Sequence, residues 1–354
     1  MNPTVLLATT LLFAPNGVGI PGHDRPPMPK RPASITALAA SPKGDLLLSG
    51  DADGYVRRLR GKDELSAVEC GRMGGAVQAI TWGEVGAFLA DDAGAIAFLE
   101  GGEPQPRAKH PGGVNALLLG PKGEILASGG QDGVIRFWQL KGDALVWHSQ
   151  LEAHEGAVSG FALEGDERKA VLWSVGWDGK LKSWKWPKAS KRIKTSATRP
   201  ASARKGNRNA RRASKRKLSR PKSEVTLGKR ELTGVALANE LLAVTGYDGR
   251  VIVIRLSRGK PKPVDLIGPQ RDYAEWVMGC VAEPGGRRIV AIAGAEAKLL
   301  VLDTHDPARR PANLMRDMKA PPHVAVFTGP RELVVGRFNG TVTRVRLPAL
   351  GGEK

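Results

Sequence analysis

The chain is poor in cysteine and in the motifs that usually mark an enzyme. Only two cysteines, Cys70 and Cys280, occur among 354 residues, and they lie 210 positions apart. No CxxC pair or His/Cys cluster has metal-ligand spacing, so we expect two buried free thiols and no metal site. The chain also lacks GxxxxGK[ST], GxSxG and HExxH motifs. These absences favour a non-enzyme without a cofactor.

Long hydrophobic runs are also lacking near the N-terminus. The apolar stretch Val5–Ala14 has ten residues, too few to cross a bilayer. It has the length of a signal-peptide core, and Gly17–Gly19 offers small residues for cleavage, although no Lys or Arg precedes it. Residues 1–20 are interpreted as a signal peptide or as a hydrophobic tail that packs on the fold or adds a strand. The first interpretation favours export, and the second a cytoplasmic or nuclear protein.

Acidic residues are absent from the segment 187–222, which carries 15 Lys or Arg and no aromatic residue. It accounts for most of the formal net charge of +19, because the rest of the chain has 39 basic and 35 acidic residues. Such a segment buries too little apolar surface to offset the cost of ordering it, so we predict a disordered basic insertion.

Dense positive charge without aromatic residues suits phosphate contacts rather than base stacking. The insertion could therefore bind RNA, DNA or another anionic polymer, and the alternative is a solvated loop extension without a ligand. The candidate anion-binding residues are Lys191, Arg192, Lys194, Arg204, Lys205, Arg208, Arg211, Arg212, Lys215, Arg216, Lys217 and Arg220.

The chain does contain a short motif that recurs seven times and that predicts a turn followed by an apolar strand. The second turn residues are Gly54, Gly94, Gly133, Gly179, Gly249, Ala297 and Gly340, which lie 40, 39, 46, 70, 48 and 43 residues apart. Asp-Gly and Asn-Gly pairs supply the positive φ angles that two-residue hairpin turns need. A period near 40–45 residues predicts an all-β, seven-bladed β-propeller of four-stranded antiparallel blades. The basic insertion explains the one long spacing.

The third and fourth repeats carry the fullest form of the unit. Residues 110–140 open with His-Pro-Gly-Gly-Val, turn at Asp132-Gly133 and close on Phe137-Trp138, and residues 154–184 follow the same order. This pattern resembles the WD-repeat (tryptophan–aspartate repeat) β-propeller family, over residues 22–347. The resemblance implies a non-enzymatic scaffold that binds protein or peptide partners on the top face of the ring. It also implies that an N-terminal strand closes the last blade.

In that family a His, a Ser or Thr, an Asp and a Trp form a buried hydrogen-bonded tetrad within a blade. The matching tetrads here are His110, Ser128, Asp132 and Trp138, and His154, Ser174, Asp178 and Trp184. A hydrolytic Ser-His-Asp triad is the alternative, but the set recurs twice in register with the repeat, as scaffolding residues do. Other repeats are degenerate. The first keeps Ser49 and Asp53 but has Arg31 and Leu59 in place of His and Trp.

The resemblance also places the remaining candidates. The stretch Asp24–Arg31 aligns with Glu103–His110 and is the expected closing strand. The insertion 187–222 falls between the third and fourth strands of blade four, on the face opposite the peptide-binding one, and residues 348–354 form a C-terminal tail. Gln131, Trp177 and Tyr247 each precede a turn Asp on the top face. They are candidate partner-binding residues, with packing against a neighbouring blade as the alternative.

Three functional hypotheses follow from these features. The first is a scaffold that docks proteins or peptides on its top face. The second is a nucleic-acid- or ribonucleoprotein-associated factor that binds phosphate through residues 187–222. The third is an exported propeller that adheres to anionic surface polymers.

Overall fold

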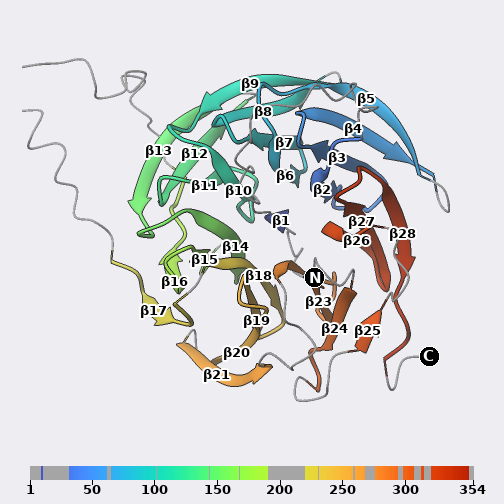
Figure 1. Ribbon diagram of the computed structural model, residues 1–354. Coiled ribbons are helices and arrows are strands. Elements are labelled where there is room, and N and C mark those ends of the chain that lie inside the picture. Colours follow the sequence, from blue (N-terminus) through green and yellow to red (C-terminus); the bar gives the residue numbers. More distant parts are fainter. Residues whose placement is uncertain are drawn as a thin grey trace, which may run out of the picture.

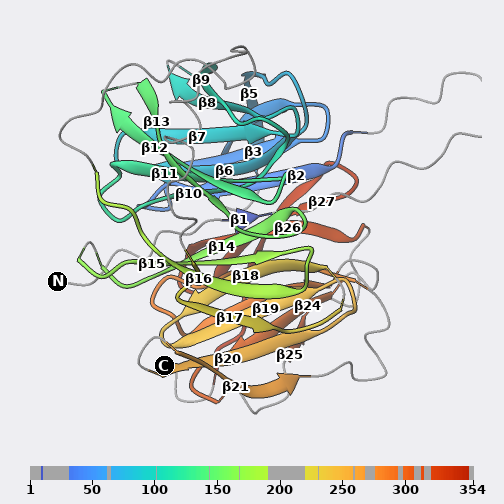
Figure 2. The ribbon, with the colours of Figure 1, turned by 90° about the vertical axis from the view of Figure 1, so that its left-hand side faces the viewer.

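The computed structural model shows a ring of seven antiparallel β-sheets, viewed down its axis in Figure 1. It describes residues 9–10, 32–61, 65–100, 102–142, 144–166, 168–189, 220–229, 231–257, 260–267, 276–293, 298–306, 312–314 and 320–350. No helix occurs among these residues. The predicted seven-bladed propeller is confirmed, and Figure 2 shows the blades from the side of the ring.

The strands follow one another along each blade from the centre of the ring outward. Blade one contains β2 (Ile35–Ala40), β3 (Leu47–Asp51), β4 (Tyr55–Arg60) and β5 (Ser66–Arg72), and blade two β6 (Val77–Gly83), β7 (Gly86–Asp91), β8 (Ala95–Glu100) and β9 (Glu103–Lys109). Blade three contains β10 (Val114–Leu119), β11 (Ile125–Gly130), β12 (Val134–Lys141) and β13 (Ala144–Glu152), and blade four β14 (Val158–Glu164), β15 (Val171–Gly176), β16 (Lys180–Lys185) and β17 (Ser223–Thr226).

The remaining blades repeat this order. Blade five contains β18 (Leu232–Ala238), β19 (Leu241–Gly246), β20 (Val251–Ser257) and β21 (Lys260–Ile267), and blade six β22 (Val277–Ala282), β23 (Arg288–Ala293), β24 (Lys298–Asp303) and β25 (Ala312–Leu314). Blade seven contains β26 (Pro322–Gly329), β27 (Glu332–Arg337) and β28 (Val342–Arg346). Among the residues described, it is the only blade with three strands.

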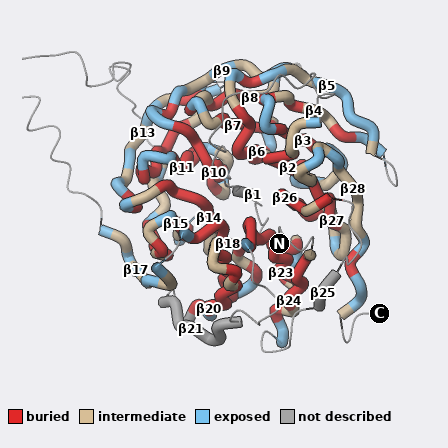
Figure 3. Tube along the Cα trace, in the orientation of Figure 1, coloured by how far each residue is buried: buried red, intermediate tan, exposed pale blue. Residues whose placement is uncertain are grey.

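Burial falls from the inner strands to the outer ones, as Figure 3 shows. Inner strands such as β10 are buried at every position, whereas the outer strand β13 alternates between exposed and partly buried residues. Apart from one polar position near their start, the inner strands are mostly apolar, which is the pattern of strands covered on both faces. Apolar clusters fill the spaces between neighbouring blades, for example Phe161 of blade four against Ile135 and Phe137 of blade three. The hydrophobic core is thus a ring of inter-blade layers.

Polar side chains join neighbouring blades at the second position of the inner strands. The hydrogen bonds run from Thr36 Oγ1 to Val77 O (2.6 Å), Asn115 Nδ2 to Val158 O (3.3 Å), Ser159 Oγ to Leu232 O (2.6 Å) and Thr233 Oγ1 to Val277 O (2.7 Å). His323 in blade seven makes the corresponding link to Ser34 Oγ of blade one, at 2.8 Å. Blade six has Met278 at this position, and Gln78 Nε2 of blade two has no partner in the part of the chain described.

A buried ion pair joins blade six to blade seven. Arg288 Nη1 lies 2.9 Å from Glu283 Oε1, and the side chains are 2% and 3% exposed. The same carboxylate oxygen accepts the backbone N–H of Arg331 at 2.7 Å, and Arg288 Nη2 donates to Pro348 O at 3.2 Å. The Glu283 carboxylate thus connects the turn after β22 with the turn between β26 and β27.

The chain enters blade one where the closing strand of blade seven would end. A Cβ on Gly340, in the β27–β28 turn, would lie 2.5 Å from Pro32 Cβ and 2.7 Å from Ala33 O. In blade two, Gly94 meets His110 O and Gly112 O in the same way, directly after the outer strand β9. This position supports closure by Asp24–Arg31, although those residues lie outside the described ones.

Two further N-terminal residues are described. Thr9 and Thr10 form β1, which pairs antiparallel with Ile80 and Ala79 of β6 and lies at the centre of the ring (Figure 1). This pairing corresponds to the extra-strand alternative for the N-terminal tail. The apolar residues on either side of β1 lie outside the described part of the chain.

Candidate functional site

The structure brings the four predicted residues of blade three together. Trp138 Nε1 donates to Ser128 Oγ at 2.8 Å, and Ser128 Oγ lies 2.9 Å from His110 Nδ1. His110 Nε2 lies 3.2 Å from Asp132 Oδ1. With the imidazole proton on Nε2, the proton order runs from the indole to the hydroxyl, from the hydroxyl to Nδ1 and from Nε2 to the carboxylate, while Arg136 Nη1 also lies against Nε2 and donates to Asp132 Oδ2. This series of hydrogen bonds ties β11 and β12 to the loop before β10.

Blade four repeats the arrangement with its imidazole turned over. Trp184 Nε1 donates to Ser174 Oγ at 2.8 Å, while His154 presents Nε2 to Ser174 at 2.8 Å and Nδ1 to Asp178 at 2.9 Å. Ser128, Ser174 and the His110 side chain are 0% exposed, so a substrate cannot reach these hydroxyls. The tetrads are therefore placed to hold a blade together rather than to act as hydrolytic triads.

Electrostatics fix the charge states in the blade-three tetrad. Burial lowers the pKa of His110, the hydrogen bond that its imidazole donates to Asp132 opposes this shift, and the nearby Arg136 charge adds to it. Burial also works against ionisation of Asp132, but hydrogen bonds from His110 and Arg136 outweigh it and lower its pKa to about 2. A neutral imidazole thus faces an ionised carboxylate at neutral pH.

The lowered pKa of His110 predicts that the stability of the fold depends on pH. Unfolded His110 takes up a proton below its ordinary pKa of about 6.5, whereas the folded imidazole does so only at lower pH. The contribution of neutral His110 to the free energy of unfolding is therefore complete above pH 6.5. It is lost as the pH falls from there towards the pKa of His110 in the folded protein. Urea unfolding of wild type and His110→Gln at pH 7.5 and 5.5 measures it. We expect a smaller difference between the two pH values in the variant, and an equal difference would refute the assignment.

In blades one and two the turn is held by aspartates that the sequence analysis did not identify. Asp51 Oδ1 accepts the N–H groups of Asp53 and Tyr55, and Asp91 Oδ1 accepts the N–H of Ala95. Both aspartates are buried, at 1% and 0% exposure, whereas Asp53, the predicted turn Asp of blade one, is exposed. The sequence aligns Asp53 with the tetrad Asp, but in the structure Asp51 accepts these bonds.

The physical reason is visible at the same position in blade three. A Cβ on Gly130 would lie 2.2 Å from His110 Nε2, so a histidine tetrad requires glycine two residues before its Asp. Blade one has Arg31 in place of His and puts Asp51 at the glycine position. The signal for this replacement was an Asp, Asp51 or Asp91, three residues before the turn glycine of each of the first two repeats.

The three predicted partner-binding residues occupy equivalent positions at one face of the ring. The backbone N–H groups of Gln131, Trp177 and Tyr247 each donate to the residue before the inner strand of the same blade, namely Gly113, Ala157 and Glu231. Gln131 and Trp177 are exposed, with Trp177 at 39%. Tyr247 is half-buried against the cluster that contains Met278, and burial together with the Glu231 charge raises its pKa to about 12.

Two more aromatic residues at this face were missed. Phe338 donates its N–H to Pro321 O, which is the same bond in blade seven, and its ring stacks on His323 with centroids 4.1 Å apart. Trp276 immediately precedes β22 and is 53% exposed, more than the other described tryptophans. No repeat motif marks Trp276, and Phe338 stands before Asn339-Gly340 rather than before an Asp-Gly pair.

Of the twelve candidate anion-binding residues, the structure describes only Arg220, which is exposed. The other eleven lie outside the described residues. The strands that flank the insertion pair with each other, Lys180–Ser183 of β16 opposite Thr226–Ser223 of β17. The insertion therefore lies between the third and fourth strands of blade four.

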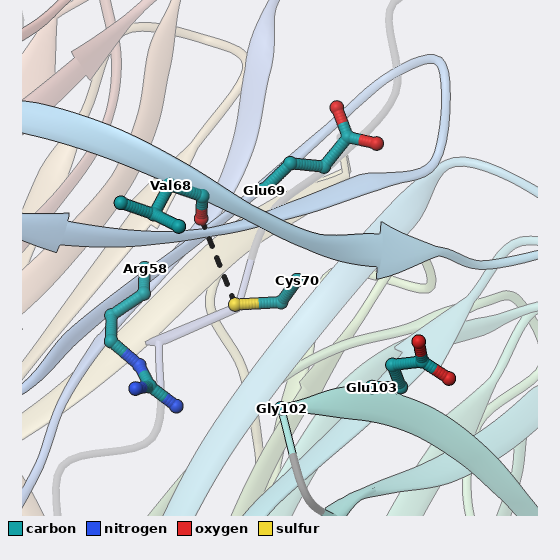
Figure 4. A pocket seen from close by; sticks show the side chains of 6 residues that line it. All are labelled: Arg58, Val68, Glu69, Cys70, Gly102 and Glu103. Carbon is teal, nitrogen blue, oxygen red and sulfur yellow. Dashed lines mark hydrogen bonds between the residues drawn. The ribbon is translucent and has the colours of Figure 1, made fainter.

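A shallow cavity lies at the outer rim between blades one and two (Figure 4). It is lined by Arg58, Val68, Glu69, Cys70, Gly102 and Glu103. Both cysteines are free, but Cys70 is only partly buried, so the prediction of two buried thiols was wrong for it. Burial raises the pKa of Cys280 to about 12, which keeps that thiol protonated.

Two further features, a metal-ligand cluster and a membrane-spanning helix, are absent from the described residues. No group of three His, Cys, Asp or Glu side chains there is placed to hold a metal ion. That part of the chain also contains no helix that could cross a membrane.

Comparison with known proteins supports the repeat assignment. The family model described as WD domain, G-beta repeat, matches residues 21–57 and 105–139. Actin-interacting protein 1-2 of Arabidopsis thaliana is 35% identical over 80 residues, which span 20% of this chain and 13% of that protein. The match therefore covers a small part of this relative's length.

Solved propellers share the fold at low sequence identity. The WD40 β-propeller domain of Doa1 has a TM-score of 0.64 and 14% identity, with 96% of both chains covered. The computationally designed Ika8 protein has a TM-score of 0.57 and 17% identity, with 89% of this chain and 96% of that one covered. Two segments of the chain thus match the WD-repeat model, and the seven-bladed ring with its two hydrogen-bonded tetrads has the fold of a WD40 β-propeller.

Proposed function

We propose that this protein is a non-enzymatic scaffold that holds a peptide segment of a partner protein on its top face, over blades four to seven. The observation that carries the proposal is the distribution of aromatic residues. Blades four, five and seven have Trp177, Tyr247 and Phe338 at the turn position, and Trp276 leads into blade six. Blades one to three have Ala52, Asp92 and Gln131 there instead. One half of the face is thus suited to side-chain anchoring.

The chemistry of this half favours a basic peptide. Glu155 and Glu231 are exposed beside the aromatic positions of blades four and five, and Glu231 is close enough to raise the pKa of Tyr247. A Lys or Arg side chain gains both from carboxylates and from the face of a Trp or Tyr ring. Aromatic residues also dominate the energetics of peptide interfaces. The partner segment is therefore expected to be extended and positively charged.

The experiment is a selection of peptides from a displayed random library on the purified protein. Peptides that bind the wild type should bind Trp177→Ala about tenfold or more weakly, because an anchoring aromatic contributes about 2 kcal/mol. The melting temperature should change little, since Trp177 is 39% exposed. The matched control is Trp147→Ala, because Trp147 is 37% exposed on the outer strand β13. Equal binding by both variants, or unfolding of Trp177→Ala, contradicts the proposal.

A second candidate function concerns the basic insertion. Fifteen Lys or Arg with no Asp or Glu in residues 187–222 favour binding to the phosphate backbone of RNA or DNA. An exported protein could instead use the same charge to adhere to anionic surface polymers. Loss of RNA binding on neutralising the arginines and lysines of 211–217 is the direct test.

A further inference from the structure

Arg337 is a half-buried cation at the top face of blade seven, directly before the aromatic residue Phe338. The N–H of the turn residue Gly340 donates to Arg337 O at 3.1 Å. The equivalent acceptor in blades three, four and five is a glycine, which leaves room for the turn Asp, because a Cβ on Gly246 would lie 2.9 Å from Asp248 Oδ1. Blade seven thus has a long charged side chain where those blades have none.

Four other blades neutralise a cation at this end of the ring with a carboxylate of their own. The pairs are Arg57 with Asp51, Arg136 with Asp132, Lys182 with Asp178 and Arg250 with Asp248. In blade seven the turn residue is Asn339, whose amide carries no charge. Among the described residues, the Arg337 side chain makes a single hydrogen bond, from Nη1 to Thr341 Oγ1 at 3.4 Å, and its Nε has no acceptor. The guanidinium therefore has no carboxylate partner in that part of the chain.

The described acidic residues of blades six and seven do not supply the missing charge. They are Glu283, Asp303, Asp306 and Glu332, which all lie at the opposite end of the ring. At the top of the adjoining blade one, Asp51 is paired with Arg57 and Asp53 is exposed. Glu296 and Asp317 lie outside the described residues. The charge of Arg337 is thus not balanced by any described residue of blades six and seven.

Partial burial suits Arg337 to binding an anion. Burial lowers the pKa of its guanidinium, and no carboxylate among the described residues acts against this shift. An arginine nevertheless stays protonated in proteins, so the charge is kept where water screens it less than in bulk solvent. The bond from Nη1 to the exposed Thr341 places the outer end of the side chain at the surface. A planar guanidinium there can bind a carboxylate through two parallel hydrogen bonds.

We propose that Arg337 binds a carboxylate of the peptide segment that the top face holds. The inference rests on the proposed function above and deepens it, because it assigns the charge that the blade-seven end recognises. Tyr247 and Phe338 pack against the same apolar cluster of blades six and seven, so a segment anchored on these aromatic residues passes beside Arg337. Glu155 and Glu231 lie at the other end of the aromatic half. A bound peptide therefore has its cations over blades four and five and its carboxylate over blade seven, which fixes its direction.

The test uses synthetic copies of the peptides that the wild type selects from a random library displayed with free C-termini. Each peptide is titrated unchanged, with its Asp and Glu residues replaced by Asn and Gln, and with its C-terminal carboxylate amidated. Arg337→Gln should bind the unchanged peptide about tenfold more weakly, because a hydrogen bond between charged groups is worth that much. It should bind the form that lacks the recognised carboxylate as the wild type does, and that form identifies whether a side chain or the C-terminus is bound.

The matched control is Lys109→Gln, since Lys109 is an exposed cation at the top of blade two, outside the aromatic half. Its affinity for every peptide form should equal that of the wild type. A second variant, Arg337→Glu, should prefer a peptide with Lys in place of the recognised acid. Circular dichroism and melting temperature should show all variants folded, because the Arg337 side chain makes only one long hydrogen bond among the described residues.

Trp177→Ala separates this inference from the proposed function. If Arg337→Gln binds every form as the wild type does, or weakens all forms equally, while Trp177→Ala still loses binding, the carboxylate site is wrong and the peptide-binding face stands. If Trp177→Ala binds as well as Trp147→Ala, or the wild type selects no peptide, the proposed function fails and the carboxylate site fails with it. A loss in Arg337→Gln that disappears with one neutralised form, with Lys109→Gln unchanged, supports both.

Discussion

Replacing Arg288 by Ala should destabilise the ring by about 3–5 kcal/mol, the cost of leaving a buried charge without its partner. Glu283 is 3% exposed, and after the substitution it keeps the N–H of Arg331 but loses both bonds to the guanidinium. The contact between Arg288 and Pro348 O is lost as well. Urea unfolding followed by intrinsic tryptophan fluorescence measures the change.

Two controls distinguish the ion pair from packing. In Glu283→Gln/Arg288→Met the amide oxygen still accepts the Arg331 N–H and no charge is buried, so most of the stability should return. Lys180→Met removes one partner of a solvent-accessible pair, Lys180 with Glu224, and should cost far less than Arg288→Ala. A loss below about 1 kcal/mol for Arg288→Ala would show that the carboxylate finds water or another partner.

Replacing Ser174 by Ala should cost about 2–4 kcal/mol, because the one hydroxyl serves two buried partners. Trp184 Nε1 and His154 Nε2 both lie 2.8 Å from Ser174 Oγ, and each buried group left unsatisfied costs about 1–3 kcal/mol. Thermal unfolding of the variant, with its far-UV spectrum as a check on the fold, measures the loss.

Ser49→Ala is the matched control for Ser174→Ala. Ser49 holds the equivalent position of blade one and is equally buried, but that blade has Leu59 and Arg31 instead of Trp and His. We expect a loss of at most about 1 kcal/mol, within the range of one ordinary hydrogen bond. Equal losses at both serines would mean that the tetrad adds nothing beyond burial of a hydroxyl.

The repeat pattern predicted the ring, because six of the seven turns have a glycine with positive φ at the same place. Gly133 and Gly179, both predicted turn residues, have φ of 75° and 71°. The two full tetrads were predictable for a similar reason, since four residue types had to recur at set distances. In both cases the constraint acts within one repeat, where sequence spacing and spatial distance are closely related.

Interactions between repeats were not predictable in this way. The hydroxyls of Thr36 and Ser159 lie in largely apolar inner strands, and their acceptors belong to the next blade. The partner of Glu283 is five residues away, but the N–H of Arg331 that shares its carboxylate is 48 residues away. Trp276 follows no repeat motif, and only the structure shows that it shares a face with Trp177.

The polar links between inner strands explain how repeats can lose the family pattern while the ring persists. Five blades lack a complete tetrad, yet three of them, blades one, five and seven, still reach the next blade through Thr36, Thr233 and His323. Where Met278 provides no such link, the carboxylate of Glu283 spans the same boundary at the other end of the strands. Selection can therefore act on the polar links between blades and leave the tetrad positions within each blade free to change. A propeller held together by links between its blades can lose the residues by which its repeats are recognised and still keep its ring.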